Sequence, residues 1–146
     1  EAVAPLVGPH TQFLSVLNGL DSEQTIKARF KLSPVLYCIA LGMDAVRDGN
    51  RVRYASAGRL DFGEASNATT SSAVARVQQA FAAANLAYTT PPSMLRTMWF
   101  KFMINVGVNQ ASAAMNAPYS VFKRDADARM LMDALSIKCN HHHSTV

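Results

Sequence analysis

Hydrophobic and polar positions follow two different patterns in the two parts of the chain. Up to Gly63, apolar residues form short runs separated by Gly, Pro, Asn and Asp, which is typical of β-strands and turns. After Gly63, apolar residues recur every three or four positions, which is typical of amphipathic helices. The pattern therefore predicts a few strands followed by helices.

The first predicted elements are a strand, a turn and a helix. Phe13–Leu17 is a short β-prone run, and Asn18-Gly19 directly after it is a turn signal. Asp21 and Gln24 have the spacing of a capping box, which predicts a helix that ends near Phe30.

Three further strands are expected before Gly63. Val35–Leu41 is a continuous apolar run and predicts a buried strand. Arg51–Ala55 and Arg59–Phe62 alternate between polar and apolar residues and predict two half-buried strands. Gly58 separates these two, and Asp48-Gly49-Asn50 marks a turn before the first of them.

The rest of the chain predicts three helices. Ser71 or Ser72 can cap the first helix, whose apolar positions end near Asn85. Pro91-Pro92-Ser93 opens a long second helix, and Pro118 closes it. Ser120 can cap a third helix. The apolar positions are Val74, Val77 and Phe81 in the first helix, and Met130, Leu131, Ala134 and Leu135 in the third.

These elements predict an α+β fold that is mainly α-helical. The 146 residues are 49% hydrophobic and 16% charged, which favours a globular chain over a disordered one. The longest apolar runs, such as Val35–Leu41, are far shorter than the roughly 20 residues that cross a bilayer. We therefore expect no membrane partner.

Charge and cysteine content exclude several classes of function. The net charge is +4, but Lys and Arg are scattered and follow no nucleic-acid-binding motif, so no nucleic-acid partner is expected. Cys38 and Cys139 form no CxxC motif and predict neither a disulfide framework nor a zinc site. Reduced cysteines favour a cytoplasmic location. His141–His143 could bind a metal only adventitiously, and no metal site is expected.

A polar stripe on the long helix is the strongest candidate for chemistry. Lys101, Asn105 and Asn109 are four residues apart, so they lie on one face and extend for about 12 Å. The other positions from Trp99 to Val108 are mostly apolar, which is typical of a helix buried in a larger body. The stripe must then bind a ligand, form an internal hydrogen-bond network, or lie on a partly exposed face.

Bound to a ligand, this stripe would favour a small oxo-acid. An apolar surrounding lowers the pKa of Lys101, so that its ammonium could act as a general acid and stabilise an oxyanion. Asn105 and Asn109 could orient a carboxylate or hydroxyl without adding charge. The sequence holds no GxSxG motif that would indicate a competing site.

Three segments resemble the ketopantoate reductase (2-dehydropantoate 2-reductase) family. LSVLNGL is similar to the family's strand that ends in Asn-Gly, and the stretch from Val35 to Glu64 is similar to its glycine-punctuated β segment. WFKFMINVGVNQASAAMNAP is similar to its W-x-K-x-x-x-N-x-x-x-N helix and is the most specific of the three.

The resemblance implies an NADPH-dependent oxidoreductase that reduces 2-dehydropantoate to pantoate in pantothenate biosynthesis. It implies that Lys101 is catalytic, that Asn105 and Asn109 bind substrate, and that Asn18 lies by the cofactor. The end of a strand is also where doubly wound sheets bind ligands, which independently favours Asn18 over a simple turn residue. The implied partner is a small 2-keto acid, and a homodimer is left open.

The same resemblance implies a domain organisation. Residues 1–19 would end a truncated dinucleotide-binding domain of Rossmann type, and residues 20–66 would form a connecting helix and β segment. Residues 67–146 would form a helical substrate domain, also truncated. No GxGxxG motif is present, so NADPH would be bound mainly by residues outside this chain, and the chain is interpreted as a fragment.

Two alternatives remain open at this stage. The chain could be a helical interaction module that dimerises through the long helix, with the polar stripe as an internal network. It could also be part of a related reductase that acts on another 2-keto acid.

Overall fold

The computed structural model describes residues 3–31 and 35–141, with side chains up to residue 136. The chain divides into two compact units, Glu1–Thr97 and Met98–Val146, and each is described by itself. Within the described residues, no helix is long and apolar enough to cross a membrane.

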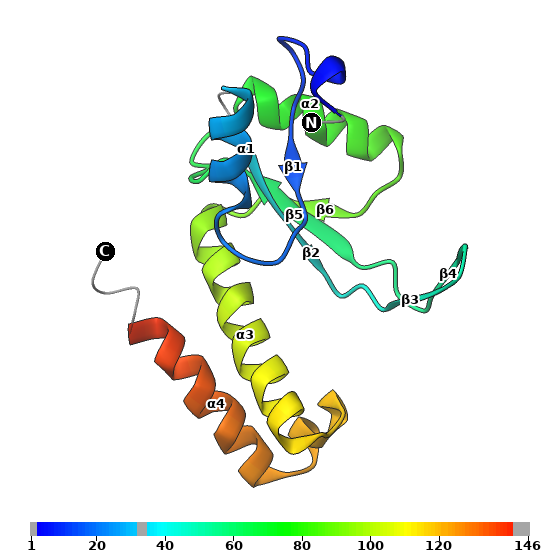
Figure 1. The fold of residues 1–146 in the computed structure, drawn as a ribbon. Coiled ribbons are helices and arrows are strands. Elements are labelled where there is room, and N and C mark those ends of the chain that lie inside the picture. Colours follow the sequence, from blue (N-terminus) through cyan, green and yellow to red (C-terminus); the bar gives the residue numbers. More distant parts are fainter. Residues whose placement is uncertain (1–2, 32–34, 142–146) are drawn as a thin grey trace. The chain divides into compact units, whose positions relative to one another are not determined.

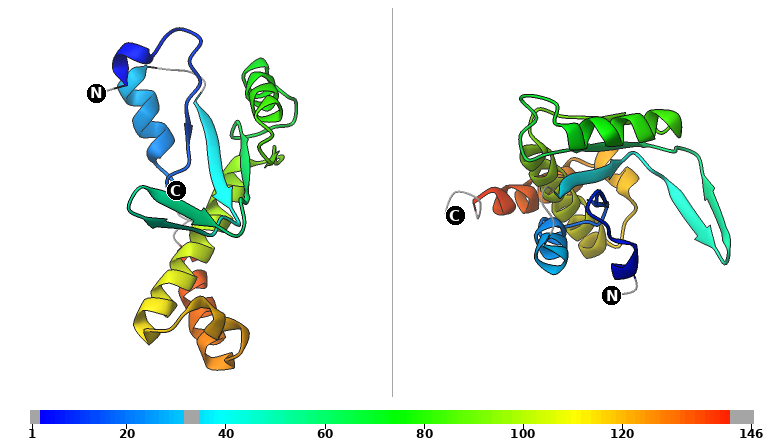
Figure 2. Two further views of the ribbon diagram at one scale, coloured as in Figure 1. Left: turned by 90° about the vertical axis from the view of Figure 1, so that its right-hand side faces the viewer. Right: turned by 90° about the horizontal axis from the view of Figure 1, so that it is seen from above.

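The first unit is built on a four-stranded mixed sheet with the strand order β1-β2-β5-β6. Strand β2 pairs with β1 in parallel and with β5 antiparallel, and β5 pairs with β6 in parallel. Helices α1 and α2 lie on opposite sides of this sheet (Figures 1 and 2). The bounds are β1 Leu14–Ser15, α1 Ser22–Phe30, β2 Leu36–Leu41, β5 Arg59–Gly63, α2 Ser72–Ala83 and β6 Tyr88–Thr89, and a 3-10 helix η1 covers Ala4–Leu6.

The core of this unit lies between the sheet and α2. Even-numbered residues of β2 and β5 share one face of the sheet, and they meet the apolar stripe of α2. Phe62 is fully buried, and its ring contacts Phe81 and Tyr88 at centroid distances of 5.1 and 5.7 Å. The buried members are Leu36, Cys38, Phe62, Ala73, Val74 and Val77.

Two of the predicted helices are confirmed in this unit. Helix α2 begins after Ser71, whose hydroxyl accepts a hydrogen bond from the Val74 backbone N–H at 3.3 Å. Helix α1 ends at Phe30 as predicted, and Asp21 is its N-cap residue. The predicted capping box is wrong, because the Asp21 side chain makes no capping hydrogen bond.

Strand predictions succeed where the strand is buried. The predicted strand Val35–Leu41 corresponds to β2, and Arg59–Phe62 corresponds to β5. In contrast, the strand predicted over Phe13–Leu17 is reduced to Leu14–Ser15, and Leu17 is 69% exposed. The end of the β-prone run, Val16 and Leu17, is therefore exposed and outside the strand.

A second, two-stranded sheet extends beyond the first (Figures 1 and 2). It pairs β3 (Ala45–Asp48) with β4 (Arg51–Tyr54) antiparallel, and every residue of both strands is exposed. The expectation that Arg51–Ala55 is half-buried is wrong, because the hairpin packs on no described part of its unit. Strand β3 was not predicted, since its residues show no apolar alternation.

A buried carboxylate joins the edge strand β6 to β5. Asp61 is 4% exposed and accepts hydrogen bonds from Arg59 Nε at 2.8 Å and from Thr89 Oγ1 at 2.7 Å. Thr89 lies directly opposite Asp61 in the ladder between β5 and β6. The hydrogen bond and the charge of Asp61 raise the pKa of the Arg59 guanidinium. Strand β6 was missed because a pair of residues carries no periodic signal.

Asn67 ties the end of the sheet to the segment before the long helix. Its Oδ1 accepts from the Glu64 backbone N–H at 2.9 Å, and its Nδ2 donates to the carbonyls of Glu64 and Pro91 at 3.1 and 2.7 Å. Gly63 leaves the space for this side chain, since a Cβ there would lie 2.5 Å from Asn67 Nδ2. Asn67 thereby holds the segment before the long helix beside the end of the sheet.

The long helix α3 (Met94–Met115) crosses the boundary of the two units, and its bounds agree with the prolines that predicted them. A 3-10 helix η2 (Tyr119–Lys123) and helix α4 (Ala126–His141) complete the second unit. The prediction that Ser120 caps α4 is wrong. Instead, Asp125 Oδ1 accepts from the backbone N–H groups of Asp127 and Ala128, both at 2.9 Å.

Helices α3 and α4 are in close contact at Gly107. A Cβ added there would overlap Ser136 Oγ and lie 2.8 Å from the Met132 carbonyl oxygen. The predicted apolar side of α4 is wrong in part, because Met130 and Leu131 are 69% and 37% exposed and Ala134 is also exposed. Among the α4 side chains that the structure describes, Ala128 is buried, and its small side chain permits close helix packing.

Candidate functional site

The predicted polar stripe lies on α3 within the second unit. Lys101 and Asn105 are half-buried, and Asn109 is exposed. Each is one turn from the next, so the Cα atoms follow the helix at steps of about 6 Å. Lys101 and Asn105 each have an interaction partner in the structure. The stripe is thus neither a fully buried network nor a fully solvated face.

Helix α4 leaves the stripe uncovered where it crosses α3. Gly107 follows Lys101 by six positions, which places it on roughly the opposite side of the helix from the centre of the stripe. Because the close contact with Ser136 and Met132 is made at Gly107, α4 packs against the face opposite the stripe.

Tyr119 extends the stripe beyond the predicted residues. Its hydroxyl lies 2.6 Å from Asn109 Oδ1 and donates a hydrogen bond to it. The two residues are ten positions apart, and no helical periodicity connects them. Sequence reasoning missed Tyr119 for this reason, since only the path of the turn after α3 brings it back to the helix.

That turn is held by hydrogen bonds at the end of α3. Asn116 has a left-handed conformation with φ of 46°, which ends the helix. The Ala117 N–H donates to the Ser112 carbonyl at 3.1 Å, and the Ser112 hydroxyl donates to the Ala117 carbonyl at 2.5 Å. Tyr119 therefore starts its 3-10 helix from a fixed position.

The apolar residues around the stripe are less buried than their sequence predicts. Trp99 and Phe102 make an edge-to-face contact at 5.8 Å, but Phe100 and Ile104 are 59% and 41% exposed. The sequence indicated a helix buried in a larger body. Within the described residues, this side of α3 is only partly covered.

Asn18 belongs to the first unit, whereas the stripe belongs to the second. It lies in an exposed bend shortly after β1, and β1 pairs in parallel with β2. The strand stops at Ser15 and not at Leu17 as predicted, so Asn18 follows the end of the strand by three residues. Asn18 also has an interaction partner in the structure.

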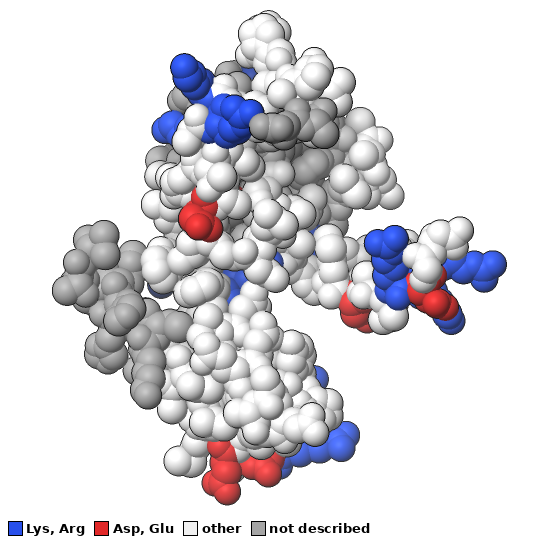
Figure 3. Space-filling view, viewed as in Figure 1, with Lys and Arg blue, Asp and Glu red and all other residues white. Residues whose placement is uncertain are grey.

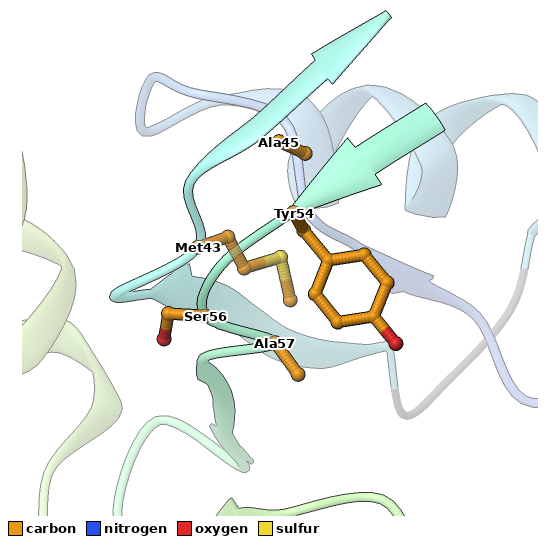
Figure 4. Close-up of a pocket in the computed structure, with 5 residues that line it drawn as sticks. All are labelled: Met43, Ala45, Tyr54, Ser56 and Ala57. Carbon is orange, nitrogen blue, oxygen red and sulfur yellow. The ribbon is translucent and has the colours of Figure 1, made fainter. Parts of the chain in front are cut away.

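Two surface hollows in the first unit contain none of these residues. One, of about 190 Å³, lies at the base of the β3–β4 hairpin, where Tyr54 faces Met43 across an apolar gap (Figure 4). The other, of about 240 Å³, lies between α1, β2 and the end of β5 and includes Glu23, Lys27, Tyr37 and Glu64. In the part of the chain that is described, no group of His, Cys, Asp and Glu could hold a metal ion. His142 and His143 lie outside that part.

Charged side chains do not gather into one basic patch on the face shown in Figure 3. Lys and Arg lie at separate places, and on the hairpin they are interspersed with acidic residues. For example, Arg53 Nη2 on β4 lies 3.6 Å from Asp48 Oδ2 on β3.

The N-terminal part of the chain matches a known protein family. The family described as ketopantoate reductase PanE/ApbA matches residues 1–67. This match covers somewhat less than half of the chain. No curated protein is similar enough to count as a match.

Solved ketopantoate reductase structures share the fold of nearly the whole chain. The 2-dehydropantoate 2-reductase of Geobacter metallireducens is 22% identical, with a TM-score of 0.80 over 94% of this chain and 45% of that one. The PanE/ApbA family ketopantoate reductase of Ralstonia eutropha is 22% identical, with a TM-score of 0.75 over 96% and 45%. The Staphylococcus aureus enzyme, described as dimeric, is 15% identical, with a TM-score of 0.73 over 99% and 49%. The chain thus spans about half the length of these structures.

Proposed function

We propose that this chain forms part of an NADPH-dependent reductase of 2-keto acids, with α3 presenting the substrate-binding surface. The observation that carries the proposal is the Lys101, Asn105 and Asn109 stripe, which lies opposite the face of α3 that packs on α4. The match of residues 1–67 to the ketopantoate reductase family supports 2-dehydropantoate as the substrate and pantoate as the product. In this proposal, residues 67–146 form the substrate domain, residues 20–66 connect it, and residues 1–19 end the dinucleotide-binding domain.

The stripe supplies the groups that reduction of a keto acid requires. The Lys101 ammonium donates a proton to the keto oxygen, on which negative charge develops as the carbonyl is reduced. Asn105 and Asn109 offer amide donors that hold the oxygens of the substrate in place while adding no charge. NADPH, when bound, supplies the hydride to the keto carbon.

Asn18 is the residue of this chain that we assign to the cofactor side. It is exposed in the bend after β1, and its amide can donate and accept hydrogen bonds with a carboxamide or hydroxyl group. The ends of parallel strands are where open α/β sheets bind nucleotides. These properties fit a contact with NADPH, although one amide is only a small part of a dinucleotide site.

Replacement of Lys101 tests the proposed chemistry. In a complete reductase that contains these residues, Lys101→Ala should lower kcat by about 10²–10⁴, as loss of a general acid does, with little change in NADPH affinity. Lys123→Ala is the matched control, because Lys123 is an exposed lysine of the same unit outside the stripe. Unchanged turnover per folded Lys101→Ala molecule would contradict the proposal, especially if the variant melted at a lower temperature.

Exposed apolar residues of α3 favour a second candidate, association of two copies of the chain. Phe100 and Ile104 are one turn apart and 59% and 41% exposed, and such side chains are often covered in oligomers. Light scattering with size-exclusion chromatography should then give a dimer that Phe100→Ser together with Ile104→Ser converts to a monomer. A monomeric wild-type chain at high micromolar concentration would rule this candidate out for the isolated chain.

A further inference from the structure

The hydrogen bond between Tyr119 and Asn109 goes beyond the residues so far assigned to the substrate. We infer that Tyr119 is a positioning residue: its hydroxyl holds Asn109 Oδ1, so that the Nδ2 amino group is the end left for the ligand. The inference rests on the proposed function, since it concerns the same surface of α3. It assigns to that end of the site an oxygen acceptor on the ligand, such as a carboxylate or hydroxyl.

Without a hydrogen bond such as the one from Tyr119, either end of the Asn109 carboxamide could face the ligand. The two ends of a carboxamide are almost identical in shape, and its terminal torsion has two broad minima. An exposed Asn109 would thus offer an acceptor oxygen or a donor amine to a ligand with similar ease. A phenol that donates to Oδ1 occupies the acceptor, so the outward end carries donors only.

The fold of the turn does not need this hydrogen bond. Backbone and side-chain bonds between Ser112 and Ala117, together with the Asn116 N–H to the Ala113 carbonyl at 3.2 Å, already hold the chain after α3. Tyr119 is 60% exposed, so folding buries little of its surface and gains little stability from it. A role through Asn109 is then separable from a role in folding.

The donor end suits the rest of the stripe. Lys101 and the Asn109 amino group both present hydrogen-bond donors, and Lys101 adds a positive charge. A ligand along this surface therefore meets donors at both ends. This arrangement matches a small oxo-acid with oxygen atoms at both ends and disfavours ligands that end in an amine.

The experiment compares four variants of the ¹⁵N-labelled 146-residue chain by NMR, with 2-dehydropantoate as the ligand and no NADPH present. The variants are Tyr119→Phe, Asn109→Ala, the double variant, and Tyr54→Phe as the control. Tyr54 is a matched tyrosine because it is 66% exposed and lies on the hairpin of the first unit. Asn109→Ala identifies the side-chain amide signals of Asn109 by their loss.

We expect Tyr119→Phe to shift the Asn109 amide signals in the free chain and to weaken 2-dehydropantoate binding by about three- to tenfold, the usual worth of one hydrogen bond. Tyr54→Phe should change neither. In the Asn109→Ala background, adding Tyr119→Phe should leave the affinity unchanged, because a positioning residue acts only through its partner. Thermal melting should be the same for Tyr119→Phe and the wild type.

Two results would overturn the inference. Asn109 amide signals that are identical in wild type and Tyr119→Phe would show that the hydrogen bond does not orient the amide. An equal loss of affinity from Tyr119→Phe with and without Asn109 would show that Tyr119 contacts the ligand itself. Failure of the proposed function looks different: 2-dehydropantoate would perturb none of the signals of Lys101, Asn105 and Asn109, while the free-chain comparison would still decide whether Tyr119 orients Asn109.

Discussion

At the scale of single residues, polar side chains differ in whether the sequence alone predicts their contacts. Lys101, Asn105 and Asn109 were predicted as one stripe because helical spacing alone determines that they share a face. Tyr119 could not be predicted, because its contact with Asn109 depends on the turn at Asn116. Asn67 was missed for a similar reason, since one of its hydrogen-bond acceptors is the carbonyl of the distant Pro91.

A charge placed at Asn109 tests whether the ligand is an anion. Asn109→Asp keeps the shape of the side chain but replaces a donor with a negative charge, whereas Asn109→Ala only removes the hydrogen bond. Because Asn109 is exposed, solvent screens part of the repulsion, and we expect KM for a 2-keto acid to rise by roughly 5- to 30-fold with Asp. With Ala, the rise should be smaller, about two- to tenfold.

The control for this charge is Gln110→Glu. Gln110 is the exposed neighbour of Asn109 and lies about 100° around the helix, so the same charge is added outside the stripe. Steady-state kinetics of a complete reductase should give a higher KM for Asn109→Asp than for Asn109→Ala. The KM of Gln110→Glu should stay near that of the wild type. Equal KM values for all three, with a lowered melting temperature for the Asn109 variants, would favour a structural role for the stripe.

At the scale of elements, burial decides which predictions hold. Strands β2 and β5 and helix α2 each present apolar residues to one core, and their sequence patterns predict them correctly. The β3–β4 hairpin has no such core to face, so its exposed strands were predicted only in part. Helix α4 was predicted, but its cap was not. Ser120 and Asp125 are both good capping residues; Ser120 lies inside the 3-10 helix η2, so Asp125 caps α4.

Gly107 lies where α3 and α4 pack closely against each other. Gly107→Ala should raise helix propensity, yet the new methyl would overlap Ser136 Oγ and press on the Met132 carbonyl. We therefore expect the free energy of unfolding to fall by about 1–3 kcal/mol, as overpacking usually costs. Urea denaturation followed by circular dichroism measures the change.

Gly8→Ala is the matched control, because a Cβ there would meet nothing closer than Thr11 Oγ1 at 4.0 Å. Ser136→Gly in the Gly107→Ala background should restore part of the stability, while the Met132 backbone contact remains. If Gly107→Ala were as stable as Gly8→Ala, the helices would not cross at this position, and the side of α3 assigned to α4 would have to be revised.

At the scale of the whole molecule, the fold class was predictable in outline, while the arrangement of the site was not. Strands followed by helices were predicted from the two hydrophobic patterns, whereas the pairing of the strands in a mixed sheet was not. The resemblance to ketopantoate reductases is confirmed for residues 1–67. The predicted location of Asn18 by a cofactor and of the stripe by a substrate depends on how two units meet, which no periodicity in the sequence encodes.

Binding of NADPH to the isolated chain is the most direct test at this scale. A dinucleotide is held largely through its pyrophosphate, which needs a glycine-rich turn at a helix N-terminus, and the 146 residues contain no GxGxxG motif. A micromolar Kd corresponds to about −8 kcal/mol, whereas one amide such as Asn18 supplies roughly 1–2 kcal/mol. We therefore expect calorimetric titration to give no micromolar binding of NADPH to this chain.

The same titration of a complete reductase that contains this chain should give micromolar binding of NADPH. A micromolar Kd for the 146-residue chain would mean that it holds a dinucleotide site of its own, and loss of that affinity in Asn18→Ala would locate the site at the end of β1.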